Sequence, residues 1–377
     1  MIIPFSKTEI MPKDIKLVNQ VLRSGWLTHG KYTNLFENEF KKYTSSRYAI
    51  TVSSCTAALH LSCLASGFKK GDEVIVPAMS HTATSHCVEY TGAKAVFADV
   101  DKVTGNISFE EIKKKFSKKT KGIIIVHMAG ISADLEKIIK FCNKKNIKLI
   151  EDCAHALGTF YKKKHVGNLG VTGCFSFYPT KQVTTGEGGI LITNSKKIYN
   201  EIKKIKAFGI DKDITERKKQ GDYDVKALGF NYRMTDFQAC LGYMQLKRYK
   251  KNLIKRKLIA KRYVKNLKKI KNITFPNYNM TSSYFIFQIL CKKKRDSLLK
   301  FFKDNKIGVS VHYKRHLPSM SYYKEKYNLK DKNFKNAKYY AENNISLPNY
   351  PKLYNKEVDY ICNKIKNFYK RENQNNG

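Results

Sequence analysis

The sequence lacks several patterns that would place it in common classes of protein. None of its nine cysteines forms a CxxC pair, which argues against a zinc site or a disulfide framework. No stretch approaches 18 apolar residues, and the opening MIIPFSKTEI has no signal-peptide run, so we expect a cytoplasmic protein. Neither GxxxxGKS/T nor GxGxxG occurs, so P-loop and dinucleotide-binding folds lose support.

Acidic residues are also scarce. The 377 residues contain 31 Asp and Glu against 72 Lys and Arg, a formal net charge of +41. Such a surplus raises the question of a nucleic-acid or anionic-membrane partner. However, it is mostly Lys in a chain also rich in Asn, Ile and Tyr, a bias that genome composition alone can produce. No nucleic-acid-binding motif accompanies it, so we expect no nucleic acid and no membrane as partner.

What is present indicates an α/β fold. Apolar residues make up 42% of the chain and aromatic residues 12%, which excludes disorder as its overall state. Apolar runs alternate with amphipathic stretches, as in a mostly parallel sheet between layers of helices. Predicted helices include Thr56–Ala65, with Thr56 as N-cap, and Ser132–Lys144. The predicted strands are Glu73–Pro77, Lys94–Asp99, Gly122–His127, Lys148–Asp152, Cys174–Phe177 and Gly189–Thr193.

The sequence pattern changes near residue 247. A Lys-rich helical stretch follows, and the later elements look like a smaller α+β domain. These elements are predicted as a strand Ser283–Leu290, a helix near Asp296–Asp304, a strand Gly308–Tyr313 and a helix around Glu357–Tyr369. We therefore expect a large domain at residues 1–247 and a small C-terminal domain at residues 248–377.

The most informative local feature is a gap in the positive charge. Residues 165–195 contain one Lys or Arg, Lys181, where about six are expected by chance. Lys181 follows three aromatic residues and precedes a Gly-rich turn. Burial there would lower its pKa and make the amine a nucleophile toward carbonyls. The alternative is an exposed loop lysine, which describes most lysines of this chain.

A carboxylate and a predicted helix start, taken together with Lys181, suit one cofactor. Asp152 ends a predicted strand, where ligands of parallel sheets bind; alternatively, it caps the next turn. With Lys181 it predicts pyridoxal 5′-phosphate (PLP), the lysine forming the Schiff base and Asp152 keeping the pyridinium nitrogen protonated. The small residues of Ser53–His60 turn into a helix N-terminus that could bind the phosphate.

Ordered segments over nearly the whole chain resemble the DegT-type sugar-nucleotide aminotransferases, PLP enzymes of fold type I. The matching segments are SGWLTHG (Ser24–Gly30), SSCTAALH (Ser53–His60), GDEVIVPAMSHTAT (Gly71–Thr84), VHMAG (Val126–Gly130), EDCAHALG (Glu151–Gly158), FSFYPTKQVTTGEGG (Phe175–Gly189), GFNYRMTDFQACLGYMQL (Gly229–Leu246), VHY (Val311–Tyr313) and ISLPNYP (Ile345–Pro351).

The resemblance implies a role for each matching position. Lys181 matches the Schiff-base lysine and Asp152 the partner of the pyridinium nitrogen. Asn231 matches an asparagine that reaches the phosphate of the other subunit's cofactor, which implies a homodimer with composite active sites. The residues matched to the phosphate site are Cys55, Thr56 and Ser176.

Two histidines depart from the common family pattern. His81 stands where the family usually stacks Trp, Phe or Tyr on the pyridine ring; imidazole can also stack, or His81 is an ordinary helix-start residue. His155 replaces a more frequent Gln beside the cofactor's phenolic oxygen, and its protonation would then matter. A deaminating or dehydrating branch of the family has His in place of the lysine, so Lys181 favours amino transfer.

The resemblance implies amino transfer from glutamate to a nucleotide-linked keto sugar, most commonly a 4-keto-6-deoxy hexose. The amino sugar would serve a surface glycan such as lipopolysaccharide O-antigen, and no metal is expected. Relatives contact the sugar nucleotide through segments that match Trp26, Thr28, His312 and Tyr313, for which ordinary packing is the alternative. The nucleotide (UDP, TDP or GDP), the keto carbon and the stereochemistry stay open.

Two other functions stay possible at this point. One is a different fold-type-I PLP enzyme, such as a lyase or a desulfurase; SGWLTHG and VHY favour the sugar-nucleotide branch, and no cysteine has the mobile-loop setting of a desulfurase nucleophile. The other is a non-catalytic nucleic-acid-binding or regulatory relative. Against it stands the joint presence of Lys181, Asp152 and Ser176.

Overall fold

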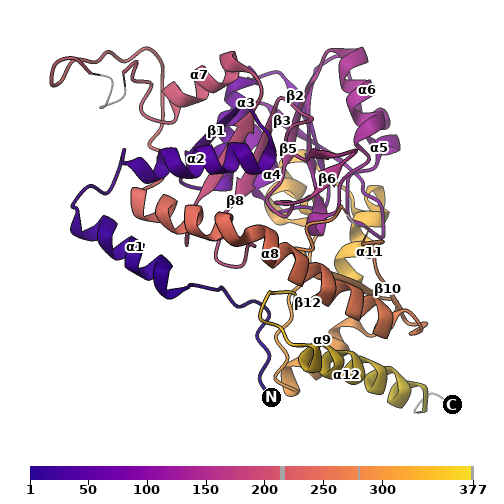
Figure 1. The fold of residues 1–377 in the computed structure, drawn as a ribbon. Helices are drawn as coiled ribbons and strands as arrows, with labels where there is room; N and C mark the ends of the chain where they lie inside the picture. Colours follow the sequence, from indigo (N-terminus) through magenta and orange to yellow (C-terminus); the bar gives the residue numbers. More distant parts are fainter. Residues whose placement is uncertain (213–216, 279–280, 375–377) are drawn as a thin grey trace.

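A seven-stranded sheet forms the centre of the larger part of the molecule (Figure 1). The structure is a computed structural model and describes residues 1–212, 217–278 and 281–374. The strand order is β1-β9-β8-β5-β4-β2-β3, and β9 runs antiparallel to both of its neighbours. The strands are β1 (Tyr48–Val52), β2 (Glu73–Pro77), β3 (Lys94–Ala98), β4 (Thr120–Val126), β5 (Lys148–Asp152), β8 (Thr172–Ser176) and β9 (Gly189–Thr193). The predicted α/β fold with a mostly parallel sheet is thus confirmed.

Helices cover both faces of this sheet, so the strands are apolar on both sides. In β4, Ile124 packs into one core cluster, while Ile123 and Ile125 pack into another on the opposite face. The first cluster takes residues from α3 (Cys55–Ala65), α4 (Ala83–Glu89) and α7 (Lys196–Ile205). The second takes residues from α2 (Lys31–Thr44), α5 (Phe109–Lys115) and α6 (Leu135–Lys145).

Two predicted helix starts were wrong by one to three residues. The N-cap of α3 is Ser54, whose Oγ accepts a hydrogen bond from the backbone N–H of Ala57 at 3.1 Å. The predicted cap, Thr56, therefore lies inside the first turn. Helix α6 begins at Leu135, not Ser132, because the carbonyl of Ser132 accepts a hydrogen bond from the side chain of Asn106.

The C-terminal part is built on a three-stranded antiparallel sheet, β10-β11-β12. Figure 1 shows α9 and α12 at the end of the molecule away from the central sheet. The strands and helices here are β10 (Ile273–Thr274), β11 (Phe287–Cys291), β12 (Asn344–Leu347), α9 (Arg295–Asp304), α10 (Ser321–Tyr327), α11 (Lys335–Asn343) and α12 (Asn355–Gln374). A hairpin of β6 (Phe160–Tyr161) and β7 (Lys164–His165) extends from the larger part.

The prediction of a strand at Gly308–Tyr313 was wrong. This segment makes only a single bridge, from Ser310 to Ser346. Its end is held by side chains instead: the N–H of His312 donates to Asn344 Oδ1 at 2.9 Å, and Gln288 Nε2 donates to the carbonyl of His312 at 3.2 Å. The segment therefore lies against the small sheet without extending it.

A single long helix, α8 (Asp236–Leu267), joins the two parts. Ala239, Leu246 and Tyr249 in its first half pack into the core of the larger part. Ile259 and Tyr263 in its second half pack into the core of the smaller part. The predicted boundary at residues 247 and 248 lies inside this helix, and we propose that α8 belongs to both domains.

Two further features complete the architecture. Helix α1 (Pro12–Arg23) packs against α8, and Arg248 of α8 donates to Asp14 of α1. All nine cysteines are buried and unpaired. Within the described part of the chain, every helix is too short or too polar to cross a membrane.

Candidate active site

Asp152 lies at the carboxyl end of β5, where both of its oxygens accept hydrogen bonds. The N–H of Ala154 donates to Oδ1 at 3.1 Å, and Thr84 Oγ1 donates to Oδ2 at 2.8 Å. The hydroxyl of Ser80 lies 2.6 Å from that of Thr84 and extends the network. Burial raises the pKa of Asp152, while the bonds from Ala154 and Thr84 lower it. The carboxylate therefore caps the following turn and also faces the site.

Lys181 lies in the turn after β8 and is partly buried, unlike most lysines of the chain. Its backbone N–H donates to the carbonyl of Tyr178 at 2.9 Å. Burial lowers the pKa of its amine to about 8, against the opposing effects of Cys55 and Asp152. The predicted desolvation of Lys181 is therefore present in the fold.

Four rings from three separate segments lie around Lys181 and Asp152. Tyr313 lies at the centre of the group, with its ring centroid 5.5 Å from His312, 6.0 Å from His81 and 6.5 Å from His155. Burial and the negative charge of Asp152 raise the pKa of Tyr313. The fold thus brings together four residues that were predicted from distant sequence segments.

His155 and His312 are neutral at physiological pH. Burial, followed by the positive charge of Lys181, lowers the pKa of His155 well below its usual range. The same two causes lower the pKa of His312 to about 3. Nδ1 of His155 accepts a hydrogen bond from the N–H of Ala129 at 3.4 Å, so the proton is on Nε2 and available for donation.

The predicted phosphate site is formed by the start of α3 and the end of β8. Gly189 of β9 pairs with Ser176 and lies against the start of α3. A Cβ on Gly189 would lie 2.4–2.6 Å from the backbone of Ser54 and Cys55, so only glycine allows this approach. The first N–H groups of a helix have no partner within the helix and favour an anion. Cys55, Thr56 and Ser176 are therefore brought close together.

Three residues of the site were missed from the sequence: Thr84, Ser80 and Phe285. Thr84 and Ser80 lie within the segment GDEVIVPAMSHTAT, so their position beside a family motif was an available signal. Phe285 comes from the smaller part, and its ring lies 4.7 Å from Nζ of Lys181. No local pattern around Phe285 marks it as a site residue.

A buried cluster of His127, Glu151 and Cys153 has the composition of a metal site, with ligand atoms within 4.8 Å of one another. The side chains of His127 and Glu151 are already engaged in hydrogen bonds. Nδ1 of His127 accepts from the N–H of Ala133, so Nε2 donates to Glu151 at 3.1 Å. Burial raises the pKa of the Cys153 thiol well above its usual range, which disfavours the thiolate that a metal needs. His127 and Glu151 thus form a buried hydrogen-bonded pair.

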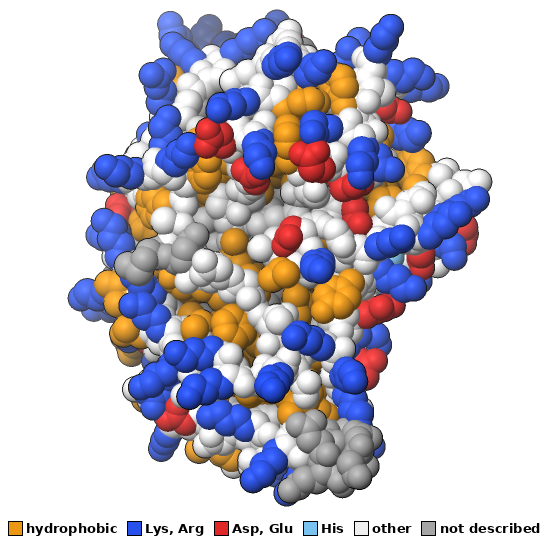
Figure 2. Space-filling view, turned by 90° about the vertical axis from the view of Figure 1, so that its right-hand side faces the viewer, with side chains coloured by type: hydrophobic (Ala, Val, Ile, Leu, Met, Phe, Trp, Pro, Cys, Tyr) orange, Lys and Arg blue, Asp and Glu red, His pale blue; other side chains and the backbone are white. Residues whose placement is uncertain are grey.

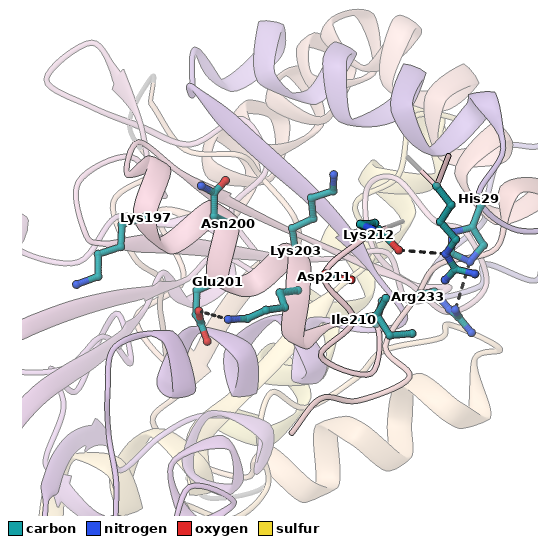
Figure 3. Close-up of a pocket in the computed structure, with 12 residues that line it drawn as sticks. His29, Lys197, Asn200, Glu201, Lys203, Ile210, Asp211, Lys212 and Arg233 are labelled. Carbon is teal, nitrogen blue, oxygen red and sulfur yellow. Dashed lines mark hydrogen bonds and ion pairs between the residues drawn. The ribbon is translucent and has the colours of Figure 1, made fainter. Parts of the chain in front are cut away.

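Trp26, Thr28 and Asn231 lie exposed on another part of the chain. Within the described part of the chain, no hydrogen bond or ring contact joins them to Lys181 or Asp152. His29 and Arg233, close to them in sequence, line a cavity of about 730 Å³ in which six of the twelve lining residues are Lys or Arg (Figure 3). Arg233 in this cavity contacts His29 at 3.2 Å and donates to Asn231 Oδ1 at 3.2 Å. The described contacts therefore do not join these three predicted residues to the group around Lys181.

Residues 8–366 match the DegT/DnrJ/EryC1/StrS aminotransferase family. The chain is 36% identical over 371 residues to the GDP-perosamine synthase of Escherichia coli O157:H7, covering 97% of this chain and 98% of the relative. Its fold is similar to that of the PLP form of Spr1654 from Streptococcus pneumoniae, with 30% identity, a TM-score of 0.91 and coverage of 98% and 99%. Helicobacter pylori PseC, an aminotransferase involved in pseudoaminic acid biosynthesis, has 28% identity, a TM-score of 0.91 and coverage of 98% and 100%.

Proposed function

The chain belongs to the PLP-dependent DegT/DnrJ/EryC1/StrS aminotransferase family, and from this premise we propose that it moves an amino group from glutamate to a nucleotide-linked keto sugar. The proposed acceptor is a 4-keto-6-deoxy hexose. Glutamate becomes 2-oxoglutarate, and the carbonyl carbon of the sugar exchanges its oxygen for an amine and gains a hydrogen. The observation that carries the proposal is the grouping of Lys181, Asp152 and the start of α3 in a chain that matches the family over nearly its full length.

The residues present fit PLP at three points. Gly189 lies close to the start of α3 and pairs with Ser176. The N-terminus of α3 and Ser176 therefore lie together, where they can bind the phosphate. Asp152 offers a buried carboxylate for a cationic ring nitrogen, and Lys181 offers a desolvated amine. When bound, PLP serves as an electron sink that lets an amino group leave one carbon and join another.

The protein's own groups would hold and move protons around this cofactor. Asp152, anchored by Thr84 and Ala154, would keep a proton on the ring nitrogen. Lys181 would accept a proton at Nζ and return it in the reverse direction, and its pKa of about 8 suits exchange near neutral pH. His155 would donate from Nε2 to the phenolic oxygen, and His81 would stack on the ring.

The substrate side is proposed from the relatives and from the rings around Lys181. GDP-perosamine synthase from Escherichia coli and PseC support a sugar nucleotide as acceptor. His312 and Tyr313 adjoin Lys181 and would contact the sugar. A 33% identical Bacillus subtilis relative, the spore coat polysaccharide biosynthesis protein SpsC, covers 98% of this chain. Its name supports a product for a surface polysaccharide; we propose that this is a glycan such as O-antigen and that the synthesis is cytoplasmic.

We further propose a homodimer whose active sites are shared between subunits. Asn231 is exposed, and its described contacts are a hydrogen bond from Arg233, which lines the cavity in Figure 3, and a backbone bridge to Ala207. In a dimer it would reach the phosphate of the partner's cofactor. Trp26 and Thr28 are exposed as well and would then contact the sugar nucleotide.

The test is an assay of the purified protein with glutamate and a panel of keto sugar nucleotides carrying UDP, TDP or GDP. We expect one panel member to gain an amine by mass spectrometry, with 2-oxoglutarate formed in equal amount. Lys181→Ala should abolish both the turnover and the absorbance of lysine-linked cofactor. The matched control is Lys164→Ala, an exposed lysine on β7, which should leave both unchanged. A Lys181→Ala variant with full turnover would refute the assignment.

A further inference from the structure

The ring of Phe285 lies against the side-chain nitrogen of Lys181. The distance from Nζ to the ring centroid is 4.7 Å, and Phe285 is 2% exposed. The face of an aromatic ring attracts an ammonium, and the attraction grows when water is excluded. The contact therefore favours the charged form of the amine, whereas burial favours the neutral form.

The same ring also holds His155. The two rings are stacked, with centroids 4.6 Å apart and an angle of 26° between their planes. His155 also accepts a hydrogen bond from the N–H of Ala129. Phe285 thus contacts both the predicted Schiff-base lysine and the predicted donor to the phenolic oxygen.

The backbone that carries Phe285 is anchored to both parts of the molecule. The N–H of Ser283 donates to the carbonyl of Gly130 at 3.1 Å, and its Oγ donates to the carbonyl of His155 at 2.7 Å. A Cβ on Gly130 would lie 2.0 Å from Ser283 Oγ, so this close approach requires glycine. From α8, the buried Arg256 donates to the carbonyl of Phe285 at 3.0 Å. The ring therefore has a fixed place relative to Lys181.

We infer that Phe285 is a positioning residue for amino transfer, because its ring fixes the place of the free Lys181 amine and sets how readily that amine takes up a proton. The inference rests on the proposed role of Lys181. It explains how an amine whose proton is weakened by burial retains that proton between accepting it and returning it.

The test measures the protonation of Lys181 directly in the full-length chain freed of cofactor. The neutral amine reacts with acetic anhydride, so the rate of Lys181 acetylation against pH, followed by peptide mass spectrometry, gives the midpoint of its titration. We expect Phe285→Leu to weaken proton binding about tenfold, so that acetylation at pH 7 becomes faster. Phe285→Tyr keeps the π face and should restore the wild-type midpoint.

The matched control is Phe287→Leu. Phe287 is also fully buried, but its ring packs on Tyr263 at 4.8 Å, so its loss should leave the midpoint unchanged. An unchanged midpoint in Phe285→Leu, or an equal shift in Phe287→Leu, would overturn the inference. Circular dichroism checks folding; if Phe285→Leu does not fold, Phe285→Met replaces it, and failure of both to fold would show that Phe285 acts only structurally.

This design tests the proposed function and the role of Phe285 independently, so that one can be refuted without the other. Acetylation of Lys181 needs neither glutamate nor a sugar nucleotide. A protein without amino-transfer activity would therefore refute the proposed function while the shift in midpoint could still be measured. Conversely, an active enzyme with an unmoved midpoint would refute only the role of Phe285.

Discussion

At the scale of single residues, burial sets the charge of Lys181. Its amine has a pKa of about 8 in the folded chain against an ordinary value of 10.5. Between these two values the unfolded chain binds a proton that the folded chain does not. The contribution of this group to the free energy of unfolding therefore rises with pH, and below pH 8 the buried ammonium costs stability.

Replacing Lys181 by Met should consequently stabilise the cofactor-free protein at pH 7 by at most about 3 kcal/mol. The gain should shrink as the pH rises from 8 and disappear above 10.5, because only there are both states neutral at this position. Urea unfolding at pH 7 and pH 10 measures the difference. Lys164→Met, at an exposed site on β7, serves as the control and should show no pH-dependent gain. Equal gains for Lys181→Met at both pH values would contradict the prediction.

A second residue-scale feature is the hydrogen bond from Thr84 to Asp152. The bond is 2.8 Å long, and Thr84 is fully buried. A hydrogen bond to a charged group contributes about 1.5–3 kcal/mol. Its loss would raise the pKa of Asp152 and loosen the carboxylate that we propose to face the ring nitrogen.

We predict that Thr84→Val lowers kcat by roughly tenfold or more, while Thr84→Ser, which keeps the hydroxyl, remains near wild type. Steady-state kinetics on the holoenzyme tests this. Ser85→Ala removes a neighbouring buried hydroxyl that bonds Tyr323 and not Asp152, and it controls for general damage to α4. A loss in Ser85→Ala as large as that in Thr84→Val would argue against a specific role of Thr84.

At the scale of secondary-structure elements, Glu151 fixes the connection between β5 and β8. Its two oxygens accept hydrogen bonds from the N–H groups of Gly167, Leu169 and Gly170 and from His127. Burial alone would raise the pKa of Glu151, but these hydrogen bonds outweigh it and lower the pKa. The side chain therefore holds the loop that delivers β8, and with it Ser176 and Lys181, beside β5.

Glu151→Gln should destabilise the protein by about 2 kcal/mol or more, because the amide NH2 would face backbone donors at a fully buried position. The stabilising effect of Glu151 is present above its unfolded pKa and is lost in acid, so the difference from wild type should shrink as the pH falls below about 4. Urea unfolding at pH 7 and pH 3.5 measures it. Glu110→Gln, at an exposed ion pair with Lys113, should change stability little, and a similar loss there would refute the prediction.

The helices and strands were predictable where their pattern was local. The bounds of β2 and β5 were predicted without error from a short apolar run that follows one charged residue, Glu73 or Lys148. The segment Gly308–Tyr313 also has a local strand pattern but is not a strand. Its backbone groups are taken by the side chains of Asn344 and Gln288, which lie elsewhere in the sequence.

At the scale of the whole molecule, the positive charge is spread over the face that Figure 2 shows. In Figure 2, Lys and Arg side chains are scattered over the face in view, with acidic side chains between them. This distribution fits solvated lysines better than a single docking patch. The charge can still draw in an anionic sugar nucleotide by long-range attraction.

The proposed dimer makes a prediction that only mixed subunits can test. Lys181→Ala and Asn231→Ala homodimers should both be impaired. In a mixed dimer, the Asn231→Ala subunit keeps its own Lys181 and receives the intact Asn231 of the partner subunit, which restores one of two sites. Random mixing of equal amounts should therefore regain about a quarter of wild-type activity. Activity that does not rise on mixing would place Asn231 in its own subunit's site, and a monomer in light scattering would refute the dimer.

The sequence by itself determined the family and the α/β fold, and it predicted Lys181 and Asp152 as the reactive pair. The charge gap marks Lys181 because a desolvated amine tolerates no nearby cations, and Asp152 is marked because parallel strands end at the ligand-binding edge of a sheet. The tertiary structure alone decided what surrounds that pair. The contacts of Phe285, Thr84 and Glu151 join segments that are distant in the chain. Such contacts depend on how β8, β11 and α4 pack, and no periodic sequence pattern indicates them.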